Sequence, residues 1–146
     1  MKFDYARYRK QRDPDVLRPI IPLLIVNSRA PLDWPIRYVA TEALVDSGSD
    51  FCIFPSELGE MIGIDVTAGQ LKMIGGVVAG ESRPLYFHVV ELSIEEGNRF
   101  EAWVGFMPDL SRTGHGILGR HSFFNRFAFV KFQDHLDKLE IGKMRR

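Results

Sequence analysis

The segment best suited to chemistry is Asp46-Ser47-Gly48-Ser49, which follows the apolar residues 43–45. Gly48 lets the backbone turn sharply behind Asp46, and the two serine hydroxyls are placed to hydrogen-bond the turn and the carboxylate. Such a carboxylate suits a hydrolysis in which one ionised group activates water and a second, protonated group donates to the carbonyl oxygen. Two carboxylates about 3 Å apart cannot both ionise, so they titrate as a pair that shares one proton.

Taken alone, however, this tetrapeptide is better explained as a surface turn, because its residues are the commonest turn formers. The other reactive residues also have simpler explanations. His115 and His121 have no cysteine or acidic cluster at ligand spacing, which argues against a metal site, and no cofactor is expected. Cys52 lies in an apolar stretch, where a buried small hydrophobic residue is expected rather than a nucleophile. Trp34, Trp103 and the phenylalanines are expected in the core and in groove walls.

The elements that must position the turn are strands, because short apolar runs separated by Gly and Pro dominate the chain. Pro22 favours an edge position for its strand, Pro55 opens a short helix, and Gly75-Gly76 predicts a two-residue hairpin turn. The pattern predicts an all-β, barrel-like domain with one or two short helices. The predicted strands are 20–26, 37–45, 51–54, 84–94, 99–107, 117–118, 127–132 and 136–141.

Length and charge limit the function further. A chain of 146 residues makes one domain, and 19 basic against 19 acidic residues give no net charge to attract nucleic acid or an anionic membrane. The single Cys52 suits a reducing compartment, and the N-terminus has no apolar signal segment. We therefore expect a cytoplasmic protein with no nucleic-acid or membrane partner. Residues 1–15 are polar and predict a mobile arm before the domain of residues 16–146.

Three segments, in this order, resemble the retropepsin-like, single-domain aspartic proteases. Leu44-Val45-Asp46-Ser47-Gly48-Ser49-Asp50 is similar to the family's active-site strand and turn. Lys72-Met73-Ile74-Gly75-Gly76-Val77 resembles the glycine-rich flap of the retroviral enzymes, and Gly116-Ile117-Leu118-Gly119-Arg120 resembles the second apolar-Gly motif. Each motif alone is weak, but the three in order are specific, and the resemblance spans residues 16–142.

The resemblance implies a closed-barrel, all-β retropepsin-like fold and an aspartic endopeptidase that is active as a homodimer on peptide or protein substrates. This chain carries the Asp-Ser-Gly motif once, so the second carboxylate has to be Asp46 of another copy. Ser47 is expected to brace the two turns, Gly48 to offer backbone groups to substrate, and the Ser49 hydroxyl to favour the ionised carboxylate. The implied flap and subsite residues are Ile74, Gly75, Gly76, Val77, Val78, Ile117 and Leu118.

Two further points stay open at this stage. The resemblance implies a structural ion pair between Asp50 and Arg120, joined by Arg18 of the neighbouring chain. The alternative is that all three are solvated surface charges, each worth little. There are two alternatives to an enzyme: a non-catalytic binding or dimerisation module of the same fold, and an unrelated small β-barrel. The intact Asp-Ser-Gly-Ser turn favours the enzyme over the module, and the order of the three motifs argues against the unrelated barrel.

Overall fold

The computed structural model describes residues 1–7, 16–75, 80–95, 97–110 and 115–146. Its strands are β1 (Lys2–Asp4), β2 (Ile20–Val26), β3 (Tyr38–Val45), β4 (Cys52–Pro55), β5 (Gln70–Gly75), β6 (Ser82–Ser93), β7 (Arg99–Met107), β8 (Gly116–Leu118), β9 (Val130–Gln133) and β10 (Lys138–Ile141). The helical segments are α1 (Ser56–Met61) and the 3-10 turns η1 (Val66–Ala68), η2 (Phe124–Arg126) and η3 (Asp134–Leu136). None of the helices in these ranges is long and apolar enough to cross a membrane.

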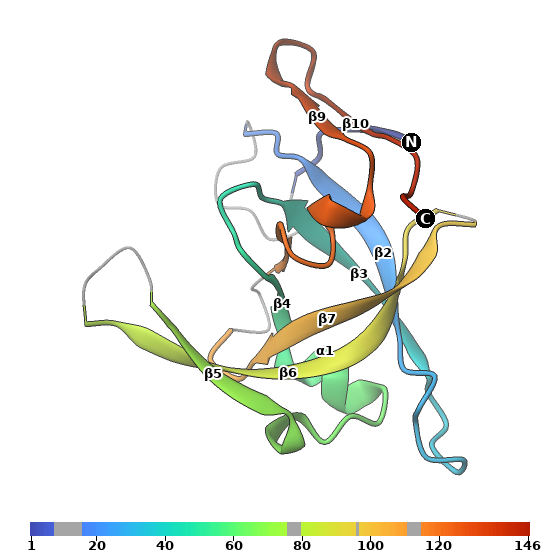
Figure 1. Ribbon diagram of the computed structural model, residues 1–146, viewed down its shortest axis with the longest axis vertical. Coiled ribbons are helices and arrows are strands. Elements are labelled where there is room, and N and C mark those ends of the chain that lie inside the picture. Colours follow the sequence, from blue (N-terminus) through green and yellow to red (C-terminus); the bar gives the residue numbers. More distant parts are fainter. Residues whose placement is uncertain (8–15, 76–79, 96, 111–114) are drawn as a thin grey trace.

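Six strands close into a barrel in the order β2, β3, β8, β4, β7 and β6, because β6 pairs back with β2. The length of β6 makes this closure possible: its first half, Ser82–Phe87, pairs with β5, and its last residues, Glu91–Ser93, pair with β2. Among the described strands, β5 pairs with β6 alone, so the β5–β6 hairpin extends away from the barrel, to the left in Figure 1. The expected closed-barrel, all-β architecture is confirmed.

Strand β2 shows how the sequence is accommodated in this barrel. It pairs with β3 from Ile20 to Val26, but with β6 only from Leu24 to Val26. Pro22 therefore lies where the strand pairs on one side only. Proline has no backbone N–H, and on the unpaired side of the strand no ladder hydrogen bond requires one. The predicted edge position of Pro22 is confirmed.

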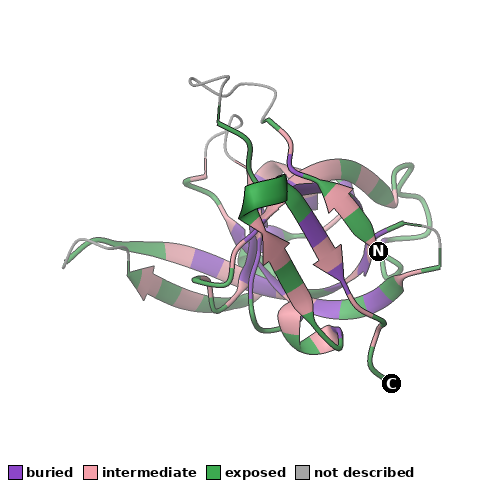
Figure 2. Ribbon diagram, turned by 90° about the horizontal axis from the view of Figure 1, so that it is seen from above, coloured by how far each residue is buried: buried purple, intermediate pink, exposed green. Residues whose placement is uncertain are grey.

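The core fills the barrel with side chains that alternate along the strands. On β6, Leu85, Phe87, Val90 and Leu92 are buried while the residues between them are partly or fully exposed. Figure 2 shows the buried residues gathered where the strands cross, whereas β5, on the extended hairpin, is half-buried or exposed. The outer part of the hairpin is therefore held mainly by backbone pairing between its two strands.

The predicted mobile arm over residues 1–15 is wrong for its first residues. Strand β1 pairs antiparallel with β10, which pairs in turn with β9, in a small sheet outside the barrel. Tyr5 is buried, Phe3 packs against the main core, and the Lys138 Nζ lies 2.6 Å from an Asp4 carboxylate oxygen. Burial of the Tyr5 and Phe3 rings against the core supplies the free energy that orders the segment. The polar composition of the segment did not reveal this contribution. Residues 8–15 lie outside the described ranges.

The two-residue turn predicted at Gly75-Gly76 is also wrong. Gly75 still belongs to β5 and pairs with Ser82, so residues 76–81 connect the two strands. The returning strand is β6, whose residues 83–86 pair with residues 71–74. The Gly-Gly pair signalled a hairpin correctly but placed its connection too early in the chain. Residues 76–79, the expected flap tip, lie outside the described residues.

Candidate active site

Asp46 directly follows β3 and is held at the point where three strands of the barrel meet. β3 runs parallel to β8 with Val45 opposite Leu118, and β8 pairs with β4 at Ile117. The Asp46 N–H donates to the Leu118 carbonyl at 3.0 Å, which extends the ladder by one residue. This places the half-buried Asp46 side chain at the end of β3, where the main chain is held by its hydrogen bond to β8.

The turn after Asp46 orients its carboxylate. The Gly48 N–H donates to Asp46 Oδ1 at 2.8 Å, and the Ser49 N–H donates to the Asp46 carbonyl at 3.2 Å. A backbone amide aimed at a carboxylate makes a charge-assisted hydrogen bond and limits rotation of the side chain. Ser47 and Gly48 are exposed, so the carboxylate is presented toward solvent in the single chain.

Ser49 does not act on the carboxylate as expected. Its hydroxyl donates to the Phe51 carbonyl at 2.8 Å, within the turn. The side chain therefore closes the turn through the local main chain, a competition that short hydroxyl side chains often win. The expected support of the ionised Asp46 carboxylate by Ser49 is corrected: in this chain the Gly48 N–H makes that contact.

The two apolar-Gly motifs, more than 65 residues apart in the chain, lie against each other. The Arg120 N–H donates to the Ser49 carbonyl and the His121 N–H donates to the Asp50 carbonyl, each at 2.8 Å. A Cβ atom added to Gly119 would lie 2.3 Å from the Phe51 carbonyl oxygen and 2.7 Å from that of Ser49. Only glycine allows the two motifs to approach each other so closely, so Gly119 fixes the position of the Asp46 turn.

The expected ion pair of Asp50 with Arg120 does not form within a single chain. The ion pairs of the described residues do not include either side chain. Both side chains instead line one hollow next to the turn. Arg18, the third expected member, is exposed and pairs through its backbone with Ala6. A pair across two chains stays a prediction.

The histidines and the cysteine occupy ordinary environments. Among the described residues, no three His, Cys, Asp or Glu side chains gather as metal ligands. His115 Nδ1 lies 3.9 Å from a Glu42 carboxylate oxygen, and partial burial lowers its pKa despite that carboxylate. Cys52 is fully buried, and burial raises the pKa of its thiol to about 12. A neutral buried thiol is a poor nucleophile, and the expectation that Cys52 is a small core residue is confirmed.

The expected subsite residues divide between the two hydrophobic clusters of the barrel. Ile74 on β5 and Ile117 on β8 are half-buried and pack against the smaller cluster of Ile53, Leu85 and Phe87. Leu118 is fully buried in the main core. Because successive residues of a strand point to opposite faces, Ile117 and Leu118 cannot both line one groove. Leu118 is therefore corrected to a core residue, and Ile117 remains the candidate.

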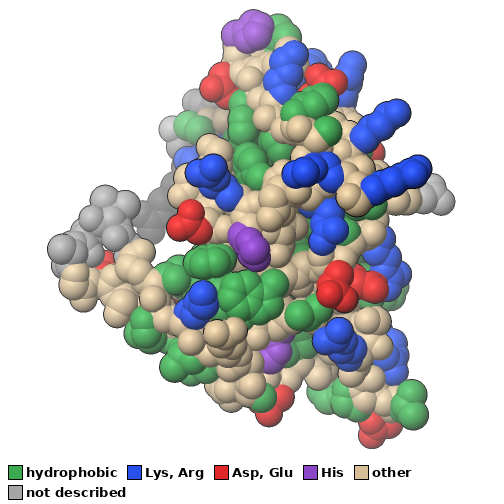
Figure 3. All heavy atoms as spheres, in the orientation of Figure 1, with side chains coloured by type: hydrophobic (Ala, Val, Ile, Leu, Met, Phe, Trp, Pro, Cys, Tyr) green, Lys and Arg blue, Asp and Glu red, His purple; other side chains and the backbone are tan. Residues whose placement is uncertain are grey.

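A hollow of about 730 Å³ lies beside the Asp46 turn, and sequence reasoning did not identify it as a unit. Its apolar walls are Phe51, Trp103 and Phe124. Figure 3 shows hydrophobic side chains over the region between β5 and β7, bordered by basic, acidic and histidine side chains. The one sequence signal for this hollow is the alternation along β5, which places Lys72 on the same face of the strand as Ile74.

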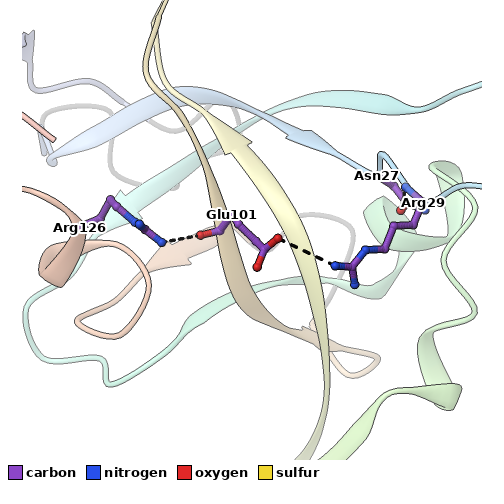
Figure 4. Close-up of polar contacts among 4 residues, drawn as sticks. All are labelled: Asn27, Arg29, Glu101 and Arg126. Carbon is purple, nitrogen blue, oxygen red and sulfur yellow. Dashed lines mark hydrogen bonds and ion pairs between the residues drawn. The ribbon is translucent and has the colours of Figure 1, made fainter. Parts of the chain in front are cut away.

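The segment after β8, which forms one wall of this hollow, is anchored to β7. An Arg126 guanidinium N–H donates to the Glu101 carbonyl at 2.9 Å, and the guanidinium carbon lies 5.5 Å from the centre of the Phe100 ring. Figure 4 shows Glu101 between Arg126 and Arg29, whose guanidinium lies 3.9 Å from the Glu101 carboxylate. The Arg29 contact is exposed and worth little. The Arg126 contacts join the segment to β7 together with the part-buried hydrogen bond from the Trp103 N–H to the Ser122 Oγ at 3.1 Å.

Comparison with known proteins agrees with this geometry. The sequence pattern of the family described as aspartyl protease matches residues 36–121, which include both Asp46 and Gly119. The match covers more than half of the chain, and the chain therefore belongs to the aspartyl protease family. No curated protein sequence matches this chain.

Solved structures are also similar to it, among them two proteases. The crystal structure of a retropepsin-like aspartic protease from Rickettsia conorii has a TM-score of 0.60 and 21% identity, covering 97% of this chain and 89% of that chain. The EIAV protease complexed with the inhibitor HBY-793 has a TM-score of 0.46 and 16% identity, covering 79% and 88%. The first similarity confirms the retropepsin-like fold that the sequence motifs implied.

Proposed function

We propose that this protein is an aspartic endopeptidase that works as a homodimer, with Asp46 of each subunit forming the catalytic pair. The observation that carries the proposal is the Asp46 turn: its carboxylate accepts the Gly48 N–H, and its main chain rests on Gly119 of the second motif. The Asp-Ser-Gly sequence occurs once in this chain, so a second copy has to supply the other carboxylate.

The reaction needs two protonation states in the pair. The ionised carboxylate accepts a proton from a water molecule as the water oxygen attacks the peptide carbonyl carbon. The protonated carboxylate donates its proton to the carbonyl oxygen, giving a neutral tetrahedral diol. The carboxylate that took the proton from water then gives a proton to the leaving nitrogen as the C–N bond breaks. The other carboxylate takes a proton from a diol hydroxyl, so the pair again holds one proton. Neither step calls for a metal or an organic cofactor.

The surrounding residues would bind the peptide. Ser47 would brace the two turns, and the exposed backbone of Gly48 would meet an extended substrate by strand-like hydrogen bonding. The β5–β6 hairpin, from Ile74 through the Gly75–Val78 segment, would serve as the flap, and Ile117 would line a subsite. In the dimer, Arg18 of the partner subunit would join Asp50 and Arg120 in the expected ion pair.

The direct test is cleavage of a diverse peptide pool by the pure protein between roughly pH 3 and pH 8, with and without a pepstatin-type inhibitor. We expect inhibitor-sensitive cleavage within peptides rather than trimming from their ends. A protein that is dimeric in solution and cleaves nothing in this range would be the non-catalytic module of the same fold.

Dimerisation is the first specific prediction. Because each chain presents one Asp46 turn, the active species is expected to have a two-fold axis between two Asp46 side chains. Sedimentation analysis across a dilution series should show dimers, and specific activity should fall as the protein dissociates. Specific activity that is unchanged in a sample shown to be monomeric would contradict the shared pair.

The pH dependence is the second prediction. The pair works when it holds one proton, so activity should follow a bell with its maximum on the acidic side of neutrality. On the rising limb the carboxylate pair loses the first of its two protons, and on the falling limb it loses the second. Since the Ser49 hydroxyl donates to Phe51 and not to Asp46, Ser49→Ala should leave the position of the optimum unchanged. A rate that climbs steadily through pH 8 would point to a different mechanism.

A further inference from the structure

The hollow beside the Asp46 turn holds a lysine in an unusual environment. The Lys72 Nζ lies 5.1 Å from the centre of the Trp103 ring, 5.3 Å from that of Phe51 and 5.9 Å from that of Phe87. These distances are in the range of cation–π attraction, which holds the ammonium over all three rings. Lys72 comes from β5, at the base of the proposed flap, and Phe51 from the active-site turn.

The three rings also fix each other. Phe87 and Trp103 are stacked with centroids 4.0 Å apart, and Phe51 meets both edge-on at 5.2 and 6.1 Å. Phe51 and Trp103 pack against the same small cluster as Ile74 and Ile117, the residues expected to line the peptide groove. Two walls of the hollow, Phe51 and Trp103, therefore share a hydrophobic cluster with the residues expected to contact the substrate.

The charges in the hollow are not balanced. Lys72 and Arg120 line it with Asp50, and the ion pairs of the described residues include none of the three. Asn125 uses its Oδ1 to accept the Ser122 N–H at 3.1 Å, which leaves its amide nitrogen as a donor. The polar lining thus offers more donors and positive charge than acceptors.

We infer that this hollow is a specificity site that takes an acidic side chain of the peptide substrate, with Lys72 as the residue that selects it. A glutamate carboxylate would pair with the Lys72 ammonium, while its methylene groups pack on Phe51 and Trp103. A basic side chain would meet like charge. An aromatic side chain would first have to displace the ammonium that already covers the rings. This inference rests on the proposed function and names a substrate class for it.

The test compares versions of one cleavable peptide that differ at a single position near the scissile bond and carry Glu, Gln, Lys or Phe there. At the position that reaches the hollow, kcat/KM for the Glu peptide should exceed that for its neutral Gln isostere about tenfold. In Lys72→Met the Glu-to-Gln ratio should fall to about one, and in Lys72→Glu the Lys peptide should become the preferred substrate. Ratios within one variant are independent of how much of it is folded.

Arg99→Met is the matched control, because Arg99 is a cation on the same sheet that pairs with Glu91 and lies outside the hollow. It should keep the wild-type Glu-to-Gln ratio. Equal rates for the Glu and Gln peptides at every position, or a preference for Phe at the position that responds to Lys72, would overturn the inference while leaving the proposed function intact.

Binding to the Asp46→Asn protein separates the inference from the proposed function. Fluorescence anisotropy with labelled Glu, Gln, Lys and Phe peptides measures recognition without cleavage. Tighter binding of the Glu peptide that is lost in the Asp46→Asn, Lys72→Met double variant supports the acidic site, even if the wild-type protein cleaves nothing. Equal affinity for the four peptides refutes it, even if the wild-type protein is an active protease.

Discussion

Asp46→Asn is expected to lower kcat/KM for peptide cleavage about a thousandfold or more, because the amide can neither accept the proton from water nor share one with its partner. The fold should survive, since the amide oxygen can still accept the Gly48 N–H that now binds Asp46 Oδ1 at 2.8 Å. Steady-state kinetics, with circular dichroism and sedimentation as checks on fold and dimer, measures this. Asp33→Asn, an identical change in the exposed connection between β2 and β3, should behave as the wild type.

Mixing the two proteins tests whether the pair is shared between subunits. If wild-type and Asp46→Asn chains exchange freely at equal concentrations, about a quarter of the dimers contain two wild-type chains. Activity should then fall to about half of that of the same wild-type protein alone. Activity that is unaffected by an excess of the inactive chain, under conditions where exchange is demonstrated, would show that one Asp46 is sufficient.

Gly119→Ala is expected to damage stability and activity together. The new methyl group would lie 2.3 Å from the Phe51 carbonyl oxygen, and because that atom belongs to the backbone, the Asp46 turn itself has to move. Overpacking of this kind costs about 3 kcal/mol, which corresponds to a fall in Tm of roughly 10 °C for a chain of this size. Displacement of the turn by about 1 Å should lower kcat/KM a further hundredfold or so.

The control for this change is Gly75→Ala, where the nearest heavy atom to the added methyl group is the Glu81 carbonyl oxygen at an ordinary 3.7 Å. Its thermal midpoint should stay at the wild-type value. Differential scanning fluorimetry at matched protein concentration gives both midpoints. If Gly119→Ala melted at the same temperature as Gly75→Ala, the close contact between the two motifs would not be a structural requirement.

Local patterns in the sequence were sufficient for much of the fold. Alternation and Pro or Gly boundaries placed β2, β6 and β7 within a residue or two, because the period of a half-buried strand is written into neighbouring residues. The same holds for the turn behind Asp46, whose hydrogen bond from the Gly48 N–H spans only two residues. The order of three short motifs then identified the family without any long-range contact.

The hollow, in contrast, was decided by tertiary structure alone. Lys72 meets rings from the active-site turn, β6 and β7, so three separate strand pairings have to be known before these residues become neighbours. Leu118 points into the core and Ile117 toward the smaller cluster, because the register of β8 between β3 and β4 sets which face is which. Register depends on partner strands far along the chain, and a shift of one residue reverses every side chain.

Asp46 illustrates which properties of the site are local in the sequence and which depend on the tertiary structure. Its identity and its turn are local properties of residues 46–49, and the sequence determined them by itself. Its position against Gly119 depends on the parallel pairing of β3 with β8, which brings together segments far apart in the chain. Closing such a contact costs chain entropy that only the completed barrel core offsets, so the geometry of the site belongs to the tertiary structure.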